Sequence, residues 1–174
     1  MKSCIHIYCG DGKGKTTAAA GLAVRAAGWG KRVLITRFLK TDNSGEVKSL
    51  GRLPEITVTP CERSFGFFSK MSEEQKAEAE VYYSLLLENT LDQAAKGVVD
   101  LLILDEILAV CNFGLVKEKR VLEFLISRPE ALEVVLTGRN PSEQLMEAAD
   151  YVSEIKKIKH PYDRGLMARR GIEF

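Results

Sequence analysis

Apolar and polar positions along this chain follow two alternating patterns. Strand-length apolar runs occur at residues 5–8, 33–39, 56–59, 98–106, 132–137 and 151–158. The segments between them repeat apolar residues at helical spacing, over 15–28, from Ser72 onward and over 117–127. Alternating strands and helices favour right-handed β-α-β crossovers, and nearly continuous apolar strands are typical of sheets buried on both faces. The pattern therefore predicts an α/β fold, with a mainly parallel sheet of about five or six strands and helices on both faces.

Local signals indicate how some of these elements begin. Ser72 and Gln75 fit a capping box, in which each side chain binds a backbone N–H that a helix start leaves free. Pro141 fits the first position of another helix, with Asn140 as its N-terminal cap. Residues 41–45 combine small polar residues with glycine and predict a loop.

Composition limits the classes of protein that the chain can belong to. The 174 residues are enough for one domain, spanning 1–174, and 45% are hydrophobic while 28% are charged, as in soluble globular proteins. The formal net charge of +1 gives no bulk attraction to nucleic acid or to an anionic membrane. The apolar runs are too short to span a bilayer, and the N-terminus lacks the features of a signal peptide. We therefore expect a cytoplasmic protein with neither nucleic acid nor membrane as a partner.

The strongest motif is a glycine-rich loop between the first strand and the first helix. Its residues are Gly10, Asp11, Gly12, Lys13, Gly14, Lys15, Thr16 and Thr17. Three glycines allow positive φ angles that turn backbone N–H groups inward as an anion nest, and the helix start adds partial positive charge. The motif predicts binding of nucleotide phosphates, with Lys15 as the main charge and the Thr16 hydroxyl available to Mg²⁺.

The loop departs from the usual pattern, because the first glycine would fall at Cys9. We therefore do not assume an ordinary nucleotide pose, and a glycine-rich turn that binds nothing is the alternative. Asp105 and Glu106 follow a buried strand, which predicts a place for them at the sheet edge beside the loop. There a carboxylate can hold Mg²⁺ directly or through water, or it can cap the helix that starts near Ile107. These features leave phosphoryl transfer, mechanical ATP hydrolysis and attack elsewhere on ATP all open.

The C-terminal third narrows the choice of reaction. The chain resembles the P-loop corrinoid adenosyltransferases over nearly its whole length. The resemblance lies in residues 136–140, 148–154, 159–165 and 168–174, taken with 10–17 and 104–106. The resemblance implies a P-loop NTPase fold of the RecA-like type and transfer of the 5′-deoxyadenosyl group of ATP to Co(I) of a corrinoid. Triphosphate would leave, and the nucleotide would lie in the reverse of the usual direction. Mg²⁺, a homodimer and an electron donor such as a reduced flavoprotein are also implied.

The resemblance also implies roles for the residues of the phosphate site. Residues 10–17 would hold the triphosphate, with Lys15 and Thr16 as the catalytic residues. Thr16 and the carboxylates, Glu106 in preference to Asp105, would hold Mg²⁺. Arg25 matches the family pattern as a further nucleotide-binding residue, and a solvated helix charge is its alternative interpretation.

The corrinoid side rests on the same resemblance. Phe67 and Phe68 lie where the family places aromatic residues that displace the lower axial ligand of cobalt and so ease its reduction. Some members carry a tryptophan where this chain has Ser69. Arg139 and His160 are implied as corrinoid-binding residues, although a solvated or ion-paired arginine and a structural histidine are the alternatives. Well-known members also have a longer N-terminal arm over the corrinoid, which we expect to be absent or replaced here.

Two further functions remain compatible with the phosphate loop. A small P-loop kinase or ATPase would transfer the γ-phosphate and release ADP. A regulatory module would bind ATP with little catalysis.

Overall fold

A single parallel sheet organises the protein. The computed structural model describes residues 3–40 and 44–173. Within them, six parallel strands lie in the order β3-β2-β4-β5-β1-β6. Their bounds in that order are Ile56–Val58, Val33–Arg37, Leu101–Asp105, Glu133–Thr137, Ile5–Cys9 and Tyr151–Glu154. The predicted α/β fold with a parallel sheet is therefore confirmed.

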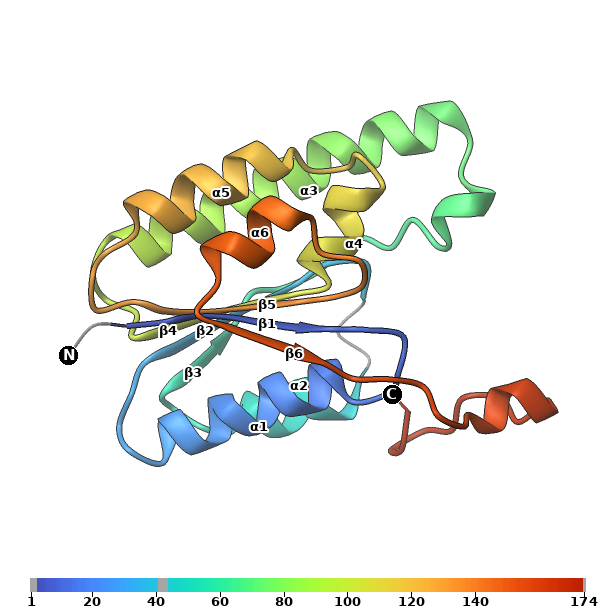
Figure 1. Cartoon of the computed structure of the whole chain (residues 1–174), viewed down its shortest axis with the longest axis horizontal. Coiled ribbons are helices and arrows are strands. Elements are labelled where there is room, and N and C mark those ends of the chain that lie inside the picture. Colours follow the sequence, from blue (N-terminus) through green and yellow to red (C-terminus); the bar gives the residue numbers. More distant parts are fainter. Residues whose placement is uncertain (1–2, 41–43, 174) are drawn as a thin grey trace.

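Helices cover both faces of this sheet (Figure 1). One face carries α1 (Lys15–Ala27) and α2 (Gly45–Leu50). The other carries α3 (Glu73–Ala95), α4 (Ile107–Asn112), α5 (Glu118–Ser127) and α6 (Glu143–Ala148). Two short 3₁₀ turns, η1 (Phe68–Lys70) and η2 (Pro161–Arg164), lie in the connecting segments. Of the described helices, not even the 23-residue α3 is apolar enough over its length to cross a membrane.

The strands divide their side chains between two cores. Leu102 and Leu104 of β4 pack with the helices α3 to α6, whereas Leu101 and Ile103 pack beneath α1. All five residues of β4 are buried, because a strand with helices on both faces has no side exposed to solvent. This accounts for the continuous apolar run in the sequence.

The predicted helix starts were right in one case and wrong in another. Ser72 and Gln75 form the expected capping box, with reciprocal bonds of 3.3 Å and 2.9 Å. The predicted Asn140 cap is wrong, because the side chain that accepts a bond from the first turn of α6 belongs to Ser142. Asn140 instead adopts a left-handed backbone at φ 48°, whereas Ser142 has the extended backbone typical of an N-terminal cap.

Two other boundaries differ from the predictions. Residues 41–43 of the predicted loop 41–45 lie outside the described residues, and Gly45 begins α2. Six residues are too few to show a helical period in the sequence. The final strand ends at Glu154 rather than continuing to 158, because the next residue turns its carbonyl toward the glycine-rich loop.

Candidate active site

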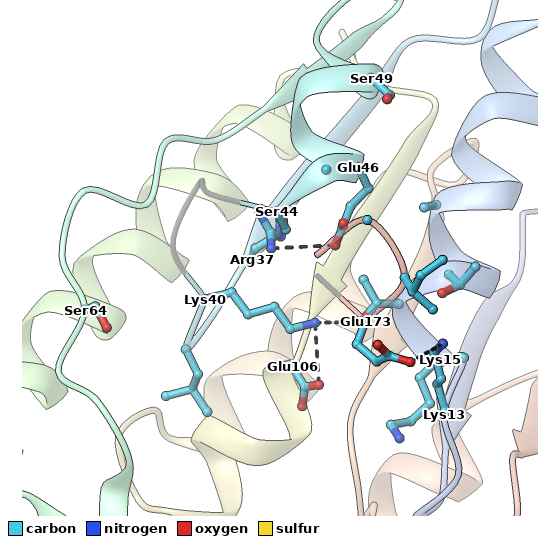
Figure 2. A pocket seen from close by; sticks show the side chains of 18 residues that line it. Lys13, Lys15, Arg37, Lys40, Ser44, Glu46, Ser49, Ser64, Glu106 and Glu173 are labelled. Atoms are coloured by element: carbon cyan, nitrogen blue, oxygen red, sulfur yellow. Dashed lines mark hydrogen bonds and ion pairs between the residues drawn. The ribbon is translucent and has the colours of Figure 1, made fainter. Parts of the chain in front are cut away.

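A cavity of about 800 Å³ opens at the carboxyl-terminal edge of the sheet (Figure 2). Parallel strands end at one edge, so the loop after β1 and the residues after β2 and β4 meet there. The C-terminal tail and the start of α2 complete the wall. Its lining includes Lys13, Lys15, Thr16, Thr17, Arg37, Lys40, Ser64, Glu106 and Glu173.

The glycines of the loop serve two different purposes. Gly10 and Gly14 have φ angles of 108° and 124°, as predicted for an anion nest. Gly12 is not in this region, so the expectation of three positive φ angles is wrong. Its N–H donates to the carbonyl oxygen of Ile155 at 2.8 Å, and a Cβ at Gly12 would lie 2.7 Å from that oxygen. Gly12 therefore permits close packing against the segment after β6 rather than adding a free N–H to the nest.

Lys15 and Asp11 use their side chains differently within this loop. Lys15 is only 8% exposed, and its Nζ donates to the carbonyl of Gly12 at 2.9 Å. Burial lowers the pKa of Lys15, and Glu106 opposes this effect. Asp11 is turned outward, because its carboxylate accepts the N–H of Lys157 at 2.9 Å, which lowers the pKa of Asp11.

The C-terminal tail contributes a carboxylate that the sequence did not indicate as part of the site. Glu173 lies 3.4 Å from the ammonium of Lys13, and it accepts bonds from the backbone and guanidinium of Arg169. These bonds from Arg169 lower the pKa of Glu173 to about 2. Phe174 lies outside the described residues.

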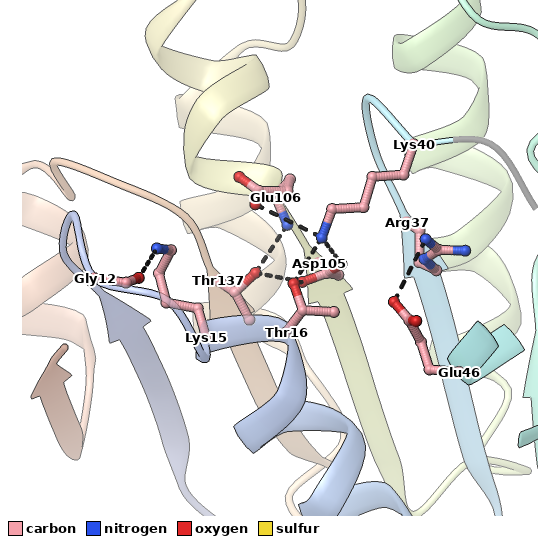
Figure 3. Close-up of polar contacts among 9 residues, drawn as sticks. All are labelled: Gly12, Lys15, Thr16, Arg37, Lys40, Glu46, Asp105, Glu106 and Thr137. Atoms are coloured by element: carbon pink, nitrogen blue, oxygen red, sulfur yellow. Dashed lines mark hydrogen bonds and ion pairs between the residues drawn. The ribbon is translucent and has the colours of Figure 1, made fainter. Parts of the chain in front are cut away.

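A polar cluster connects the loop to β4 and β5 (Figure 3). Thr16 and Thr137 donate their hydroxyls to one oxygen of Asp105, at 2.9 Å and 2.7 Å. Lys40 donates to the other Asp105 oxygen at 2.8 Å and to the Thr16 oxygen at 2.6 Å. The backbone N–H of Glu106 donates to the Thr137 hydroxyl at 2.9 Å. Asp105 is 1% exposed, so these donors compensate a carboxylate that water does not reach.

The chemistry of this cluster fits a magnesium ion. Its hydroxyl and carboxylate oxygens are the ligands that Mg²⁺ prefers, and the Lys40 ammonium stands among them as a cation. Glu106 holds a left-handed backbone at φ 63°, a conformation that costs energy outside glycine and is often found at functional sites. It precedes α4, yet its side chain makes no capping bond, which argues against the capping alternative.

Several site residues were not predicted from the sequence. Thr137 is the last residue of β5, and Lys40 lies three residues after the end of β2. Arg37 is buried opposite Glu46 with 3.8 Å between their charged atoms. The edge rule that singled out Asp105 would have found Thr137 and Lys40 if applied to every strand. The Arg37 pair could not have been found in this way, because its partner comes from the unpredicted α2.

Nine of the sequence-predicted residues lie outside the lining of this cavity: Gly10, Asp11, Gly12, Arg25, Asp105, Phe67, Phe68, Arg139 and His160. Arg25 is exposed in the last turn of α1, ten residues after Lys15 and therefore roughly 15 Å along the helix axis. Arg139 is exposed after β5, and its charge contributes to lowering the pKa of Lys15. His160 caps η2 by accepting the Tyr162 N–H at 3.1 Å, which is a structural role.

The two predicted aromatic residues differ in burial, because Phe67 is exposed whereas Phe68 packs against the hydrophobic core. Phe67 is 76% exposed. Phe68 is half-buried and stacks on Phe113, with 4.5 Å between ring centroids and 2° between planes. Phe113 was not predicted, because it follows α4 and only tertiary structure brings it to η1. Ser64 of the same segment lines the cavity, so Phe67 and Phe68 follow closely after a residue of the cavity wall.

Comparison with known proteins decides the family. The model of the family "ATP:corrinoid adenosyltransferase BtuR/CobO/CobP" matches residues 1–174. The chain belongs to this family. The corrinoid adenosyltransferase of Pseudomonas aeruginosa is 33% identical over 175 residues, covering 99% of this chain and 84% of that protein. The corrinoid adenosyltransferase of Escherichia coli K12 is 29% identical over 173 residues, covering 99% and 86%.

A solved structure extends the comparison at the level of fold. The cytoplasmic domain of EssC matches with a TM-score of 0.52 at 14% identity, covering 96% of this chain and 35% of that chain. At this identity the match concerns the fold alone. This ATP:corrinoid adenosyltransferase family member is therefore a transferase built on the α/β fold described above.

Proposed function

We propose how the residues of this site carry out adenosyl transfer from ATP to a corrinoid. The electron pair of Co(I) forms the bond to the ribose C5′, and the C5′–O bond breaks so that its electrons leave with triphosphate. Catalysis then requires neutralising a whole triphosphate, because the leaving group carries the developing charge. At one end of the cavity, Lys15 supplies a positive charge, and the loop with its positive φ angles supplies backbone N–H groups. The observation that carries the proposal is that Ser64, three residues before Phe67, lines this same cavity.

Mg²⁺ belongs to the proposal, with Thr16, Glu106 and Asp105 as the residues that hold it. When bound, the ion would neutralise charge on the phosphate oxygens. Asp105 is nearly fully buried and accepts two hydroxyl bonds, whereas Glu106 lines the cavity. This difference supports Glu106 as the residue that faces the ion directly, with Asp105 acting through Thr16.

For the corrinoid, we propose that Phe67 and Phe68 lie against the face of the ring and displace the lower axial ligand. The stack on Phe113 fixes the Phe68 plane, and it supplies a second aromatic surface in a chain that has Ser69 where some relatives have tryptophan. Arg139 would meet the anionic or amide periphery of the corrinoid, and His160 would orient the tail. We further propose a cytoplasmic homodimer that receives electrons from a donor such as a reduced flavoprotein.

An anoxic assay with ATP, Mg²⁺, a strong reductant and cobalamin tests the reaction. The corrinoid spectrum and the released anion are followed together. Adenosylcobalamin with triphosphate is expected. ADP and phosphate without a corrinoid change would instead indicate a kinase or ATPase, and binding without turnover would indicate a regulatory module.

A variant pair tests the aromatic assignment. Phe67→Ala should reduce the rate of adenosylation from Co(II) while ATP affinity stays unchanged. Trp29→Ala is the matched control, because Trp29 is also an exposed aromatic residue and lies at the far end of α1. Equal rates for the two variants would contradict the role of Phe67.

A further inference from the structure

The ammonium of Lys40 lies within reach of three oxygen-bearing side chains of the polar cluster. Its distances are 2.6 Å to the Thr16 hydroxyl, 2.8 Å to Asp105 and 3.7 Å to Glu106. A lysine ammonium has three N–H donors and no acceptor, so it can satisfy several oxygens as a small cation does. Figure 3 shows the Lys40 side chain extending from the segment that follows β2 across to these oxygens.

The charge balance explains why a cation is needed here before any ligand arrives. Asp105 and Glu106 are adjacent carboxylates, and Asp105 is almost completely buried. Thr16 and Thr137 supply neutral donors only, so among the contacts of the described residues Lys40 is the cation that compensates Asp105. An uncompensated buried carboxylate would be strongly unfavourable.

The residue before Lys40 has a backbone conformation that is costly for any residue other than glycine. Among the described residues, three that are not glycine have positive φ: Leu39, Glu106 and Asn140. They follow β2, β4 and β5, so this costly conformation is concentrated at one sheet edge. Leu39 directly precedes Lys40, at the point where the chain leaves β2 and Lys40 reaches the cluster.

We propose that Lys40 is a built-in competitor of the metal, occupying the cation position in the nucleotide-free protein until nucleotide brings the metal in. Two cations cannot share oxygens within 3 Å of each other without strong repulsion. The free protein therefore binds divalent metal weakly, and metal enters together with ATP while the ammonium moves into the cavity. The inference rests on the proposed metal site at Thr16, Asp105 and Glu106.

Mn²⁺ titration of the nucleotide-free protein, followed by the paramagnetic resonance signal of free aqueous Mn²⁺, tests this competition. Lys40→Met should bind Mn²⁺ about tenfold or more tightly than the wild type, because the metal no longer displaces charge-assisted hydrogen bonds. Lys13→Met removes a charge from the same cavity without touching these oxygens and should change Mn²⁺ affinity less than about twofold. Equal affinities for Lys40→Met and wild type would overturn the proposal.

Stability gives a second measurement that does not depend on turnover. Mn²⁺ should raise the melting temperature of Lys40→Met and leave that of the wild type nearly unchanged, since a ligand stabilises only a state that binds it. If Lys40→Met does not fold even with Mn²⁺, Lys40→Gln takes its place with the same expected result. The absence of a Mn²⁺-dependent shift in the folded variant would count against the competition.

Mn²⁺ with ATP and no corrinoid separates failure of this inference from failure of the metal site itself. Thr16→Val should alter the spectrum of protein-bound Mn²⁺–ATP. If it does and Lys40→Met still binds Mn²⁺ no better than wild type, the competition is wrong and the metal site stands. If Thr16→Val leaves the spectrum unchanged, the proposed metal site is wrong and the competition fails with it.

Discussion

The backbone N–H of Gly12 donates to the carbonyl of Ile155 at 2.8 Å, so the glycine-rich loop is held by the segment that follows the edge strand β6. A second bond in the same place joins Lys157 to Asp11. The shape of the loop therefore depends on the C-terminal part of the chain as well as on its own glycines. This dependence makes the loop sensitive to substitutions that its own φ angles would tolerate.

Gly12→Ala should damage both stability and nucleotide binding. The new Cβ would lie 2.7 Å from the Ile155 oxygen and 2.9 Å from its Cγ2, so the loop or the tail must move. We expect a loss of about 1–3 kcal/mol in the free energy of unfolding. Urea denaturation and ATP titration measure the two effects. Gly21→Ala is the control, since nothing lies within 4 Å of its Cβ in α1 and it should gain about 1 kcal/mol.

Lys15→Met should weaken ATP binding without lowering the stability of the folded protein. Burial lowers the pKa of Lys15, which means that its charge is held less favourably in the folded protein than in water. Replacing it with an unbranched apolar side chain should leave the melting temperature unchanged or higher, while ATP affinity falls by about 10–100-fold as charge-assisted contacts to phosphate are lost. Calorimetric titration with ATP measures this, and ATP affinity equal to that of the wild type would refute the loop assignment.

Thr137→Val tests the support of the buried carboxylate. The change removes a donor to Asp105 and the acceptor of the Glu106 N–H without changing side-chain shape. We expect a cost of about 1–3 kcal/mol in unfolding free energy, because buried polar groups lose partners. Thr57→Val on the exposed side of β3 is the matched control and should be nearly neutral. Similar denaturation midpoints for both variants would contradict this account.

The contribution of Asp100 to the stability of the protein should depend on pH. Arg32 binds its carboxylate through the side chain and the backbone, which lowers the pKa of Asp100 from 3.8 to about 2. A lowered folded-state pKa stabilises the protein above the unfolded value, and this contribution is lost as pH falls from 3.8 toward 2. Asp100→Asn should therefore be less stable than wild type at pH 6, with the gap narrowing below pH 4. A constant gap across a urea-denaturation series from pH 6 to pH 3 would rule this out.

Local sequence signals predicted the features that depend on neighbouring residues. The capping box at Ser72 and the buried strand that ends in Asp105 were both identified correctly. The Asn140 cap failed because Ser142 offers the same chemistry two residues later, and local sequence does not say which residue keeps an extended backbone. Cap positions therefore need the path of the preceding loop, which packing decides.

The sequence by itself determined the parallel α/β architecture, the glycine-rich loop with Lys15 and Thr16, the carboxylates at the end of β4 and, through resemblance, the family. These properties follow from periodicity and from residue types at fixed spacing, and both are visible in the sequence alone. Tertiary structure alone decided that Lys40 meets Thr16 and Asp105, that Phe113 stacks on Phe68 and that Glu173 faces Lys13. Each of these pairs joins distant segments, because strand order and crossovers, rather than sequence spacing, set which side chains share an edge.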